Sequence, residues 1–206
     1  ARRIGNNIYR YLRDKLKLPI NRDKSGIRKP LQFNILGYSF VPTYEKGTKG
    51  KYQLVVSQKS WQSLKAKLKS ITRKTTPSSF DQRVKKLIEV GRGWINYFRM
   101  GSIQGKLKVL DGWVRNRLRY CIWHHWKKPE RKRKNLIQLG VSHDNAYQWS
   151  RSRMGGWAVA KSPILGTTIT VERLNKRGYE SLLYFYENVA PHLNEPLYTR
   201  SVRTVV

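Results

Sequence analysis

The sequence predicts a mostly α-helical α+β protein, and three observations lead to this prediction. Apolar residues recur with a helical period through the middle of the chain, and two short extended segments precede them. Hydrophobic residues make up 39% of the 206 residues, which is enough to bury a core despite a formal charge of +31. We therefore expect an N-terminal helix with a β-hairpin, then a three-helix bundle, and then a basic C-terminal extension.

The N-terminal part of the chain predicts one helix and one hairpin. An apolar stripe with a helical period runs through residues 2–17 and consists of Ile4, Ile8, Tyr11, Leu12 and Leu16. Pro19 ends this helix, because proline disfavours helical geometry in the residue before it. Residues 31–40 and 52–56 follow as extended segments, and the turn-rich stretch 42–50 joins them as a hairpin with a long loop.

The middle of the chain predicts three amphipathic helices joined by short breaks, which is typical of a small bundle. The apolar stripe of the first helix consists of Trp61, Leu64, Leu68 and Ile71. Residues 75–79 break this helix, and Ser79 with Gln82 can form a capping box for the second. The third helix runs from about residue 104 to residue 125.

The last part of the chain has a mixed pattern. Residues 127–134 resemble a charged connector, short apolar pieces lie around 157–159 and 164–171, and a helix is expected near 180–188. The changes in pattern divide the chain into three expected domains, at residues 1–56, 57–128 and 129–206.

Positive charge dominates the composition, with 43 Lys and Arg against 12 Asp and Glu. A dense positive charge attracts polyphosphates such as nucleic acids, and the protein binds them more strongly as each neutralised phosphate releases counterions. The 7 Trp, 12 Tyr and 5 Phe can stack on unpaired bases, which favours RNA over DNA. An anionic membrane surface is the competing partner. No apolar run approaches the ~18 residues of a spanning helix, and we expect no membrane partner.

No pattern in the sequence predicts a catalytic centre. The single Cys121 cannot build a disulfide or a multi-thiolate zinc site, and the 4 histidines lack metal-ligand spacing. No pair of carboxylates lies in a setting that would hold two catalytic metal ions, and no phosphate-binding glycine loop is present. We therefore predict no catalytic or metal-ligating residue in this chain. With no visible signal peptide and one cysteine, we expect a reducing intracellular compartment.

The third helix of the bundle combines arginines with aromatic residues. These residues are Trp113, Arg115, Arg117, Arg119, Tyr120 and Trp123. A guanidinium plane grips phosphate and also stacks, so the mixture suits folded RNA with unstacked bases. The competing interpretation is an ion pair between Asp111 and Arg115, with the tryptophans in the core. We favour RNA binding for the arginines, because acids are too few to pair them, and the core for the individual tryptophans.

Several segments of the chain resemble a known family. Residues 21–30 (NRDKSGIRKP) and 33–40 (FNILGYSF) are similar to the last two reverse-transcriptase blocks of group II intron-encoded proteins. Residues 91–98 (GRGWINYF) and 110–119 (LDGWVRNRLR), continuing to Lys127, resemble the thumb of these proteins, or maturase domain X. The segments occur in the order and spacing of the family.

The resemblance covers roughly residues 1–130, and residues 155–179 look similar to the family's C-terminal part. It implies a remnant of the reverse-transcriptase palm with a primer-grip hairpin in residues 1–56, and a helical thumb in residues 57–128. The chain would bind group II intron RNA to assist splicing and intron mobility, as the C-terminal part of a retroelement reverse transcriptase. Because it begins with Ala1 in what resembles the middle of a helix, we expect a fragment or a trimmed chain.

The family's catalytic Asp-Asp turn and zinc-bearing endonuclease have no counterpart in the sequence. We therefore expect no cofactor in this chain, and Mg²⁺ for the parent RNA-directed DNA polymerase and for the intron RNA. The implied partners are group II intron RNA, template–primer RNA or DNA, and target DNA. The implied location is the cytoplasm or nucleoid of a bacterium, with an organelle left open.

RNA or template–primer contacts are expected in all three domains. The resemblance places Lys24 and Ser25 near the template–primer, and Gly37 and Tyr38 in the primer grip, with a strand bulge as the alternative for Gly37. The full set is Lys24, Ser25, Arg28, Lys29, Gly37, Tyr38, Lys65, Lys69, Arg73, Arg92, Asn96, Arg99, Arg115, Arg117, Arg119, Trp123, Lys127, Lys128, Arg131 and Arg133. Two other interpretations stay open: a non-enzymatic, general RNA- or DNA-binding protein, and an inactive relic.

Overall fold

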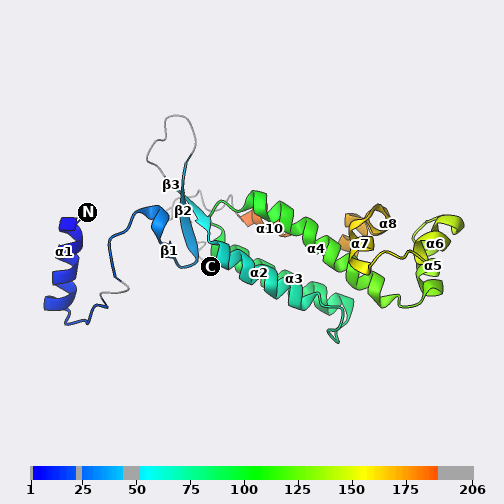
Figure 1. Ribbon diagram of the computed structural model, residues 1–206, viewed down its shortest axis with the longest axis horizontal. Coiled ribbons are helices and arrows are strands. Elements are labelled where there is room, and N and C mark those ends of the chain that lie inside the picture. Colours follow the sequence, from blue (N-terminus) through cyan, green and yellow to red (C-terminus); the bar gives the residue numbers. More distant parts are fainter. Residues whose placement is uncertain (1, 22–24, 44–51, 190–206) are drawn as a thin grey trace, which may run out of the picture. The chain divides into compact units, whose positions relative to one another are not determined.

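Helices dominate the computed structural model, which we describe over residues 2–21, 25–43 and 52–189 (Figure 1). The chain divides into two units, Ala1–Val55 and Val56–Val206. The first holds a helix and most of a small sheet, and the second is helical. This composition confirms the predicted α+β, mostly α class.

The first unit begins with α1 (Arg2–Arg10), which continues into a π-helical turn, η1 (Tyr11–Lys15). The helix predicted over residues 2–17 is thereby confirmed nearly to its end. Lys17 has a φ of 51°, a left-handed conformation that L-residues do not sustain in a helix. The helix therefore ends before this residue.

The apolar stripe of α1 lies on the surface of this unit. Ile4 is 65% exposed, and Ile8, Tyr11 and Leu16 are exposed as well. Helices in proteins gain most of their stability when an amphipathic face packs on a core. Within the described residues the stripe has the predicted period but is not buried.

A three-stranded sheet follows in the order β1 (Asn34–Ile35), β2 (Tyr38–Pro42) and β3 (Tyr52–Val56). β1 and β2 are antiparallel, with Asn34 opposite Ser39. The extended segment predicted over residues 31–40 is therefore wrong as a single strand, because the chain reverses within it. The long loop predicted between the strands falls mostly on residues outside those described.

A tight turn at Leu36 and Gly37 causes this reversal. Their φ angles are 50° and 81°, the left-handed pair that a two-residue type I′ hairpin turn requires. Glycine adopts this conformation without steric cost, so Gly37 is a turn residue and not a strand bulge. The Ser39 hydroxyl donates to Asn34 Oδ1 at 2.6 Å across the hairpin and fixes its register.

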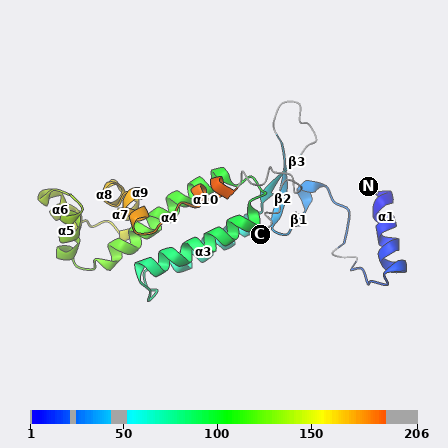
Figure 2. The ribbon, with the colours of Figure 1, turned by 180° about the vertical axis from the view of Figure 1, so that it is seen from behind.

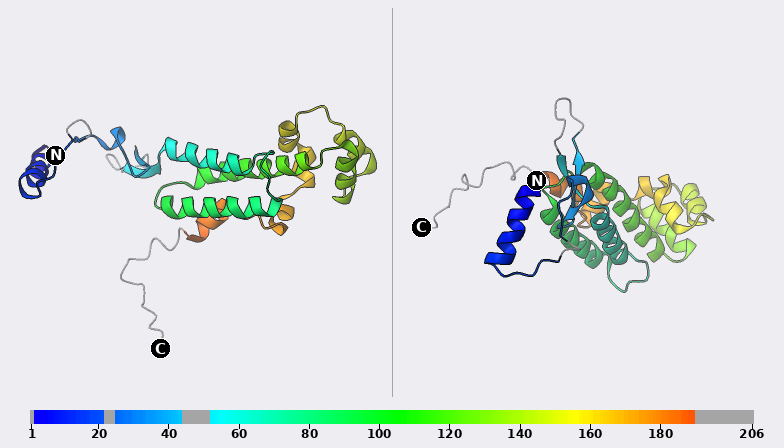
Figure 3. Two further views of the ribbon diagram at one scale, coloured as in Figure 1. Left: turned by 90° about the horizontal axis from the view of Figure 1, so that it is seen from below. Right: turned by 60° about the vertical axis from the view of Figure 1, so that its left-hand side comes forward.

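Three long helices form the core of the second unit: α2 (Gln58–Ile71), α3 (Phe80–Phe98) and α4 (Gln104–His125) (Figure 3). All three predicted helices are confirmed. The predicted capping box of α3 is also present, since the Gln82 N–H donates to Ser79 Oγ at 3.2 Å and the Ser79 N–H to Gln82 Oε1 at 3.1 Å. The fully buried leucines of the three helices are Leu64, Leu68, Leu87, Leu107 and Leu118.

Shorter helices continue the described part of this unit. They are α5 (Pro129–Gln138), α6 (His143–Ser150), α7 (Gly156–Lys161), α8 (Pro163–Thr168), α9 (Val171–Lys176) and α10 (Leu182–Val189). α5 packs on α6, α7 packs on α4 and α8, and α10 packs on both α3 and α4. Figure 2 shows α7, α8 and α9 beside one end of α4. The helix predicted near residues 180–188 is confirmed as α10.

The charged connector predicted over residues 127–134 is wrong beyond Lys128, because α5 begins at Pro129. Proline at the first helical position has a suitable φ and lacks only an N–H that would be unpaired there. Leu136 of α5 is completely buried and anchors the helix. The division of residues 57–206 into two domains stays a prediction.

A buried carboxylate of α4 holds the start of α10. Asp111 is 2% exposed and accepts hydrogen bonds from the Leu182 and Leu183 N–H groups at 3.0 and 2.9 Å. The hydroxyls of Tyr179 and Ser181 also donate to it, at 3.0 and 2.5 Å. Asp111 thereby satisfies N-terminal donors of α10 that have no partner within that helix.

Candidate nucleic-acid interface

A row of cations and aromatic rings crosses α2, α4 and α7. We call it the cation–aromatic face, and it consists of Lys65, Trp113, Arg117, Tyr120, Trp157 and Lys161. None of its members is acidic. The three rings and Arg117 are half-buried, and the two lysines are exposed.

Arg117 lies at the centre of the face, among its three rings. Its Cζ is 5.9 Å from the ring centroid of Trp113, 5.5 Å from that of Tyr120 and 5.6 Å from that of Trp157. Lys65 Nζ lies 5.4 Å from the Trp113 centroid on one side. Lys161 Nζ lies 6.0 Å from the Trp157 centroid on the other. These distances fall within the range of cation–π attraction.

Helical spacing and one small residue create this arrangement. Trp113, Arg117 and Tyr120 occupy positions i, i+4 and i+7 of α4, so they lie on the same face of the helix. α7 approaches closely at Gly156, where a Cβ would lie 3.2 Å from the Tyr120 ring. That close approach brings Trp157 beside Arg117.

Arg117 also closes the C-terminal end of α2. Its guanidinium donates to the Thr72 carbonyl at 2.7 Å and to the Thr72 hydroxyl at 3.0 Å, through Nη2 and Nε. A cation is favourable at a helix C-terminus, where carbonyls lack partners. Nη1 of Arg117 has no hydrogen-bond acceptor among the described residues. One edge of this guanidinium can therefore still bind a phosphate.

Arg83 holds the loop that follows α2. It is only 8% exposed, and it donates to the carbonyls of Arg73 at 2.5 Å, of Ser78 at 3.2 Å and of Thr76. The Cys121 thiol donates to the Thr72 carbonyl at 3.3 Å. Burial raises the pKa of Cys121, so the thiol remains protonated and keeps this donor. Loop 72–79 is thus fixed by side chains of α3 and α4.

Arg119, another of the arginines predicted on α4, is also engaged within the protein. Arg119 donates to the Ile169 carbonyl at 2.9 Å and to Asn116 Oδ1 at 3.0 Å. Burial and the nearby charge of Arg115 lower the pKa of Arg119. The scarcity of acids does not leave Arg117 and Arg119 free, because backbone carbonyls serve as their acceptors. Among the described residues Asp111 forms no ion pair with Arg115, and its carboxylate instead binds the start of α10.

Part of this helical unit matches a known protein family. Residues 61–140 match the model of the family described as group II intron, maturase-specific domain. Over these residues the chain is similar to a group II intron maturase-specific domain. The match confirms the resemblance to the C-terminal part of intron-encoded maturases, and it supports a role in group II intron splicing with intron RNA as partner. No curated protein matches the chain.

The matched domain extends from α2 through α5, so it contains four members of the cation–aromatic face. Trp157 and Lys161 of α7 lie beyond the matched residues. In residues 2–21, 25–43 and 52–189, no group of three His, Cys, Asp or Glu side chains could hold a metal ion. No helix in those same ranges is both long and apolar enough to cross a bilayer.

Predicted cations of the maturase-specific domain are mostly exposed. The exposed ones are Lys65, Lys69, Arg73, Arg92, Lys127, Lys128, Arg131 and Arg133, and Asn96 is exposed as well, whereas Arg99 is half-buried. Arg92 forms an ion pair with Glu180, and its Cζ lies 5.1 Å from the Phe185 ring centroid. This arginine thus helps to hold α10, and its RNA contact stays a prediction.

Trp123 does not present a free ring for stacking. It is 4% exposed, and Lys132 Nζ lies 4.4 Å from its ring centroid. Trp126 packs against it edge-on at 5.9 Å between centroids. The burial fits the general preference of helical tryptophans for the core, and it disfavours the predicted RNA contact of Trp123.

The predicted template–primer residues belong to the first unit. Ser25, Arg28 and Lys29 are exposed, and Gly37 with Tyr38 lies at the β1–β2 turn. Lys24 lies outside the described residues. Their contacts with template–primer stay predictions.

The contacts predicted from the sequence leave out four members of the cation–aromatic face: Trp113, Tyr120, Trp157 and Lys161. The i, i+4, i+7 spacing of Trp113, Arg117 and Tyr120 could have revealed the stripe on α4. No local signal could have shown that α7 packs against it, because this contact joins residues distant in the sequence.

Proposed function

We propose that this chain binds group II intron RNA through the cation–aromatic face and thereby stabilises the intron fold that splices. The observation that carries this proposal is Arg117, whose guanidinium lies among three half-buried rings while one edge stays available. Such a site offers stacking surfaces for unpaired bases together with a phosphate donor. The maturase-specific domain supplies the reason to expect intron RNA as the ligand.

The proposal separates recognition from simple charge attraction. A formal charge of +31 makes the chain adhere to most nucleic acids at low salt. Stacking, shaped hydrogen bonds and 2′-hydroxyl contacts depend much less on salt than phosphate contacts do. The exposed cations outside the face, such as Lys69 and Arg131, would supply the salt-dependent part.

We extend the proposal to the parent protein. The sequence blocks of the first unit support a reverse-transcriptase palm with a primer grip, in which Gly37 would let nucleic acid approach the backbone. The parent would then be an RNA-directed DNA polymerase that uses Mg²⁺ and acts on target DNA during intron mobility. Two-metal polymerisation needs paired carboxylates, so we expect no DNA synthesis by this chain alone.

The test is competition binding with the 206-residue chain at two salt concentrations. A labelled, folded group II intron is challenged with excess tRNA and with duplex DNA. We expect the intron to remain bound at physiological salt. If tRNA competes as well as unlabelled intron at both salts, the chain is a general nucleic-acid-binding protein and the proposal is wrong.

A charge-matched pair of variants assigns the interaction to the face. Lys65→Gln with Lys161→Gln removes two cations of the cation–aromatic face. Lys85→Gln with Lys108→Gln removes two exposed cations elsewhere on the helical unit, so the change in net charge is equal. We expect the first variant to lose intron selectivity and the second to keep it. Equal selectivity in both would place recognition outside the face.

A further inference from the structure

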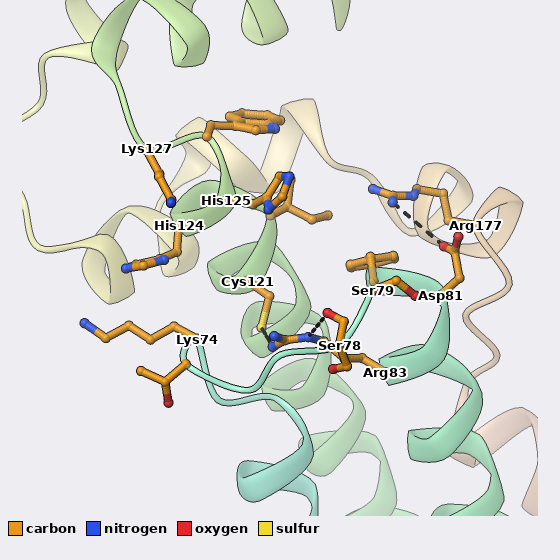
Figure 4. Close-up of a pocket in the computed structure, with 14 residues that line it drawn as sticks. Lys74, Ser78, Ser79, Asp81, Arg83, Cys121, His124, His125, Lys127 and Arg177 are labelled. Atoms are coloured by element: carbon orange, nitrogen blue, oxygen red, sulfur yellow. Dashed lines mark hydrogen bonds and ion pairs between the residues drawn. The ribbon is translucent and has the colours of Figure 1, made fainter.

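A cleft of about 620 Å³ lies where loop 72–79 meets the C-terminal end of α4 (Figure 4). Residues that line it include Lys74, Phe80, His124, His125, Lys127 and Arg177. Its volume falls within the range of about 300–1,000 Å³ that small-molecule sites occupy. The cleft is separate from the cation–aromatic face, and none of the residues predicted from the sequence except Lys127 lines it.

The walls of the cleft carry an excess of positive charge. In Figure 4, Lys74, His124 and Lys127 gather on one side, whereas Arg177 and Asp81 lie together on the other. Asp81 is the one carboxylate among the lining residues, and its Oδ1 is 3.8 Å from Arg177. In the part of the chain that the structure describes, neither Lys74 nor Lys127 pairs with a carboxylate.

The floor of the cleft is held in place before any ligand arrives. Arg83 binds three carbonyls of loop 72–79, and the Cys121 thiol binds the Thr72 carbonyl. Figure 4 shows Arg83 and Cys121 together, below His124 and His125 and beside Lys74. A site whose supporting side chains are already fixed loses less entropy when it binds.

The cation–aromatic face leads towards this cleft along α4. His124 continues the stripe of Trp113, Arg117 and Tyr120 with the same helical spacing. The Tyr120 and His124 ring centroids are 6.2 Å apart. From Trp113 to His124 the helix rises by about 16 Å, so one strand of a few nucleotides could follow the stripe and enter the cleft.

We propose that the cleft binds a single unpaired nucleotide of the RNA strand that follows the face, with the phosphate between Lys74, His124 and Lys127. The opposite wall offers a planar surface for the base, because the Arg177 guanidinium lies 3.9 Å from the Phe80 ring centroid. Arginine planes and aromatic rings both stack on bases that have left a helix. This inference rests on the proposed function, but it concerns a different set of residues.

The pKa of the His124 imidazole should change when a phosphate binds in the cleft. Partial burial and the charges of Lys74, Lys127 and Lys132 lower the pKa of His124. Lys74 belongs to loop 72–79, Lys127 to the segment between α4 and α5, and Lys132 to α5, and the Tyr120 ring also lies beside His124. A phosphate between them would offset their charge and raise the pKa. By linkage, binding should then strengthen as the pH falls through the range in which His124 titrates.

The experiment follows the histidine imidazole signals of the 206-residue chain by NMR. Uridine 5′-monophosphate, uridine and inorganic phosphate are titrated separately. We expect the nucleotide to shift the His124 signals and raise its pKa, phosphate to do so at least tenfold more weakly, and uridine to have no effect. Lys74→Gln with Lys127→Gln should weaken nucleotide binding at least tenfold. Lys85→Gln with Lys108→Gln, of equal charge change, should alter it less than twofold.

Two results would overturn the inference. If the nucleotide leaves His124 unchanged, or binds both double variants equally, the cleft is not its site. If inorganic phosphate binds as tightly as the nucleotide, the cleft is a simple anion site and the nucleotide assignment is wrong. If the chain selects the intron in the competition assay but does not bind the nucleotide, only the inference about the cleft is wrong. If the chain does not select the intron, the proposed function is wrong.

Discussion

The two sides of α4 satisfy their polar groups in different ways. Towards α3 and α10, carboxylates are used: Asp111 binds the start of α10, and Glu180 pairs with Arg92. Towards α2 and α7, Arg117 instead binds backbone carbonyls of Thr72 and Lys69 at the end of α2. Both arrangements satisfy hydrogen bonds.

The difference lies in the charge that remains. A carboxylate neutralises its cation, whereas a carbonyl accepts a hydrogen bond and leaves the guanidinium charge in place. With only 12 acids against 43 Lys and Arg, carboxylates cannot pair most of the cations. On the α10 side Glu180 therefore neutralises Arg92, whereas on the α2–α7 side the guanidinium of Arg117 keeps its charge. This contrast is why we place RNA on the second side.

The largest effect should come from removing the carboxylate that serves the α10 side. Asp111→Ala leaves the Tyr179 hydroxyl and two N–H groups of α10 without their acceptor. We expect a loss of about 3–4 kcal/mol in the free energy of unfolding, because unpaired buried donors carry their full desolvation cost. Urea denaturation measures the loss. Full stability of the variant would show that α10 is not held in this way.

A pair of glycines on α3 gives a matched test of the same side. Gly91→Ala would place a Cβ 2.3 Å from Leu182 Cδ2 of α10, whereas Gly93→Ala meets nothing within 4 Å. We expect the first to destabilise by about 1–3 kcal/mol through overpacking. The second should stabilise by about 0.5–1 kcal/mol through helix propensity. Thermal unfolding measures the stability of both variants. Equal changes in stability would mean that α10 does not pack at Gly91.

Arg117 tests whether the α2–α7 side combines structure and binding. Arg117→Lys keeps the charge but loses the planar fork that reaches Thr72 and faces the rings. We expect a loss of about 1–2 kcal/mol in stability, because charged hydrogen bonds to Thr72 are lost. The salt dependence of RNA binding should stay almost unchanged, since the charge remains, while intron selectivity falls. Wild-type selectivity in a folded Arg117→Lys variant would contradict the stacking role of Arg117.

The sequence predicts those features of the fold that depend on neighbouring residues, and not those that depend on contacts between distant segments. Local patterns gave the three long helices and the capping box at Ser79, because periodicity and end signals act within one helix. The sequence did not predict α5, because residues 127–134 are mostly cations and show no apolar stripe. The buried residue that anchors this helix, Leu136, follows that charged run.

Long-range contacts explain what the sequence could not predict of the site. The carbonyls that bind Arg117 and Arg119 lie on other elements, so a count of acids could not reveal them. Trp157 joins the face only because α7 packs at Gly156. Burial of Trp123 depends likewise on Lys132 and Trp126 around it.

The smallest effect should come from the exposed cations of α5, which form no part of either side of α4. Arg131→Gln with Arg133→Gln removes two charges without removing a buried contact, so stability should change by less than about 0.5 kcal/mol. If both arginines contact phosphates, the log–log salt slope of single-stranded RNA binding should fall by about 1.4, which is about 0.7 for each contact. Intron selectivity should persist, because phosphate contacts position RNA without selecting it. An unchanged slope would confine the interface to the cation–aromatic face and the cleft, and lost selectivity would assign recognition to α5.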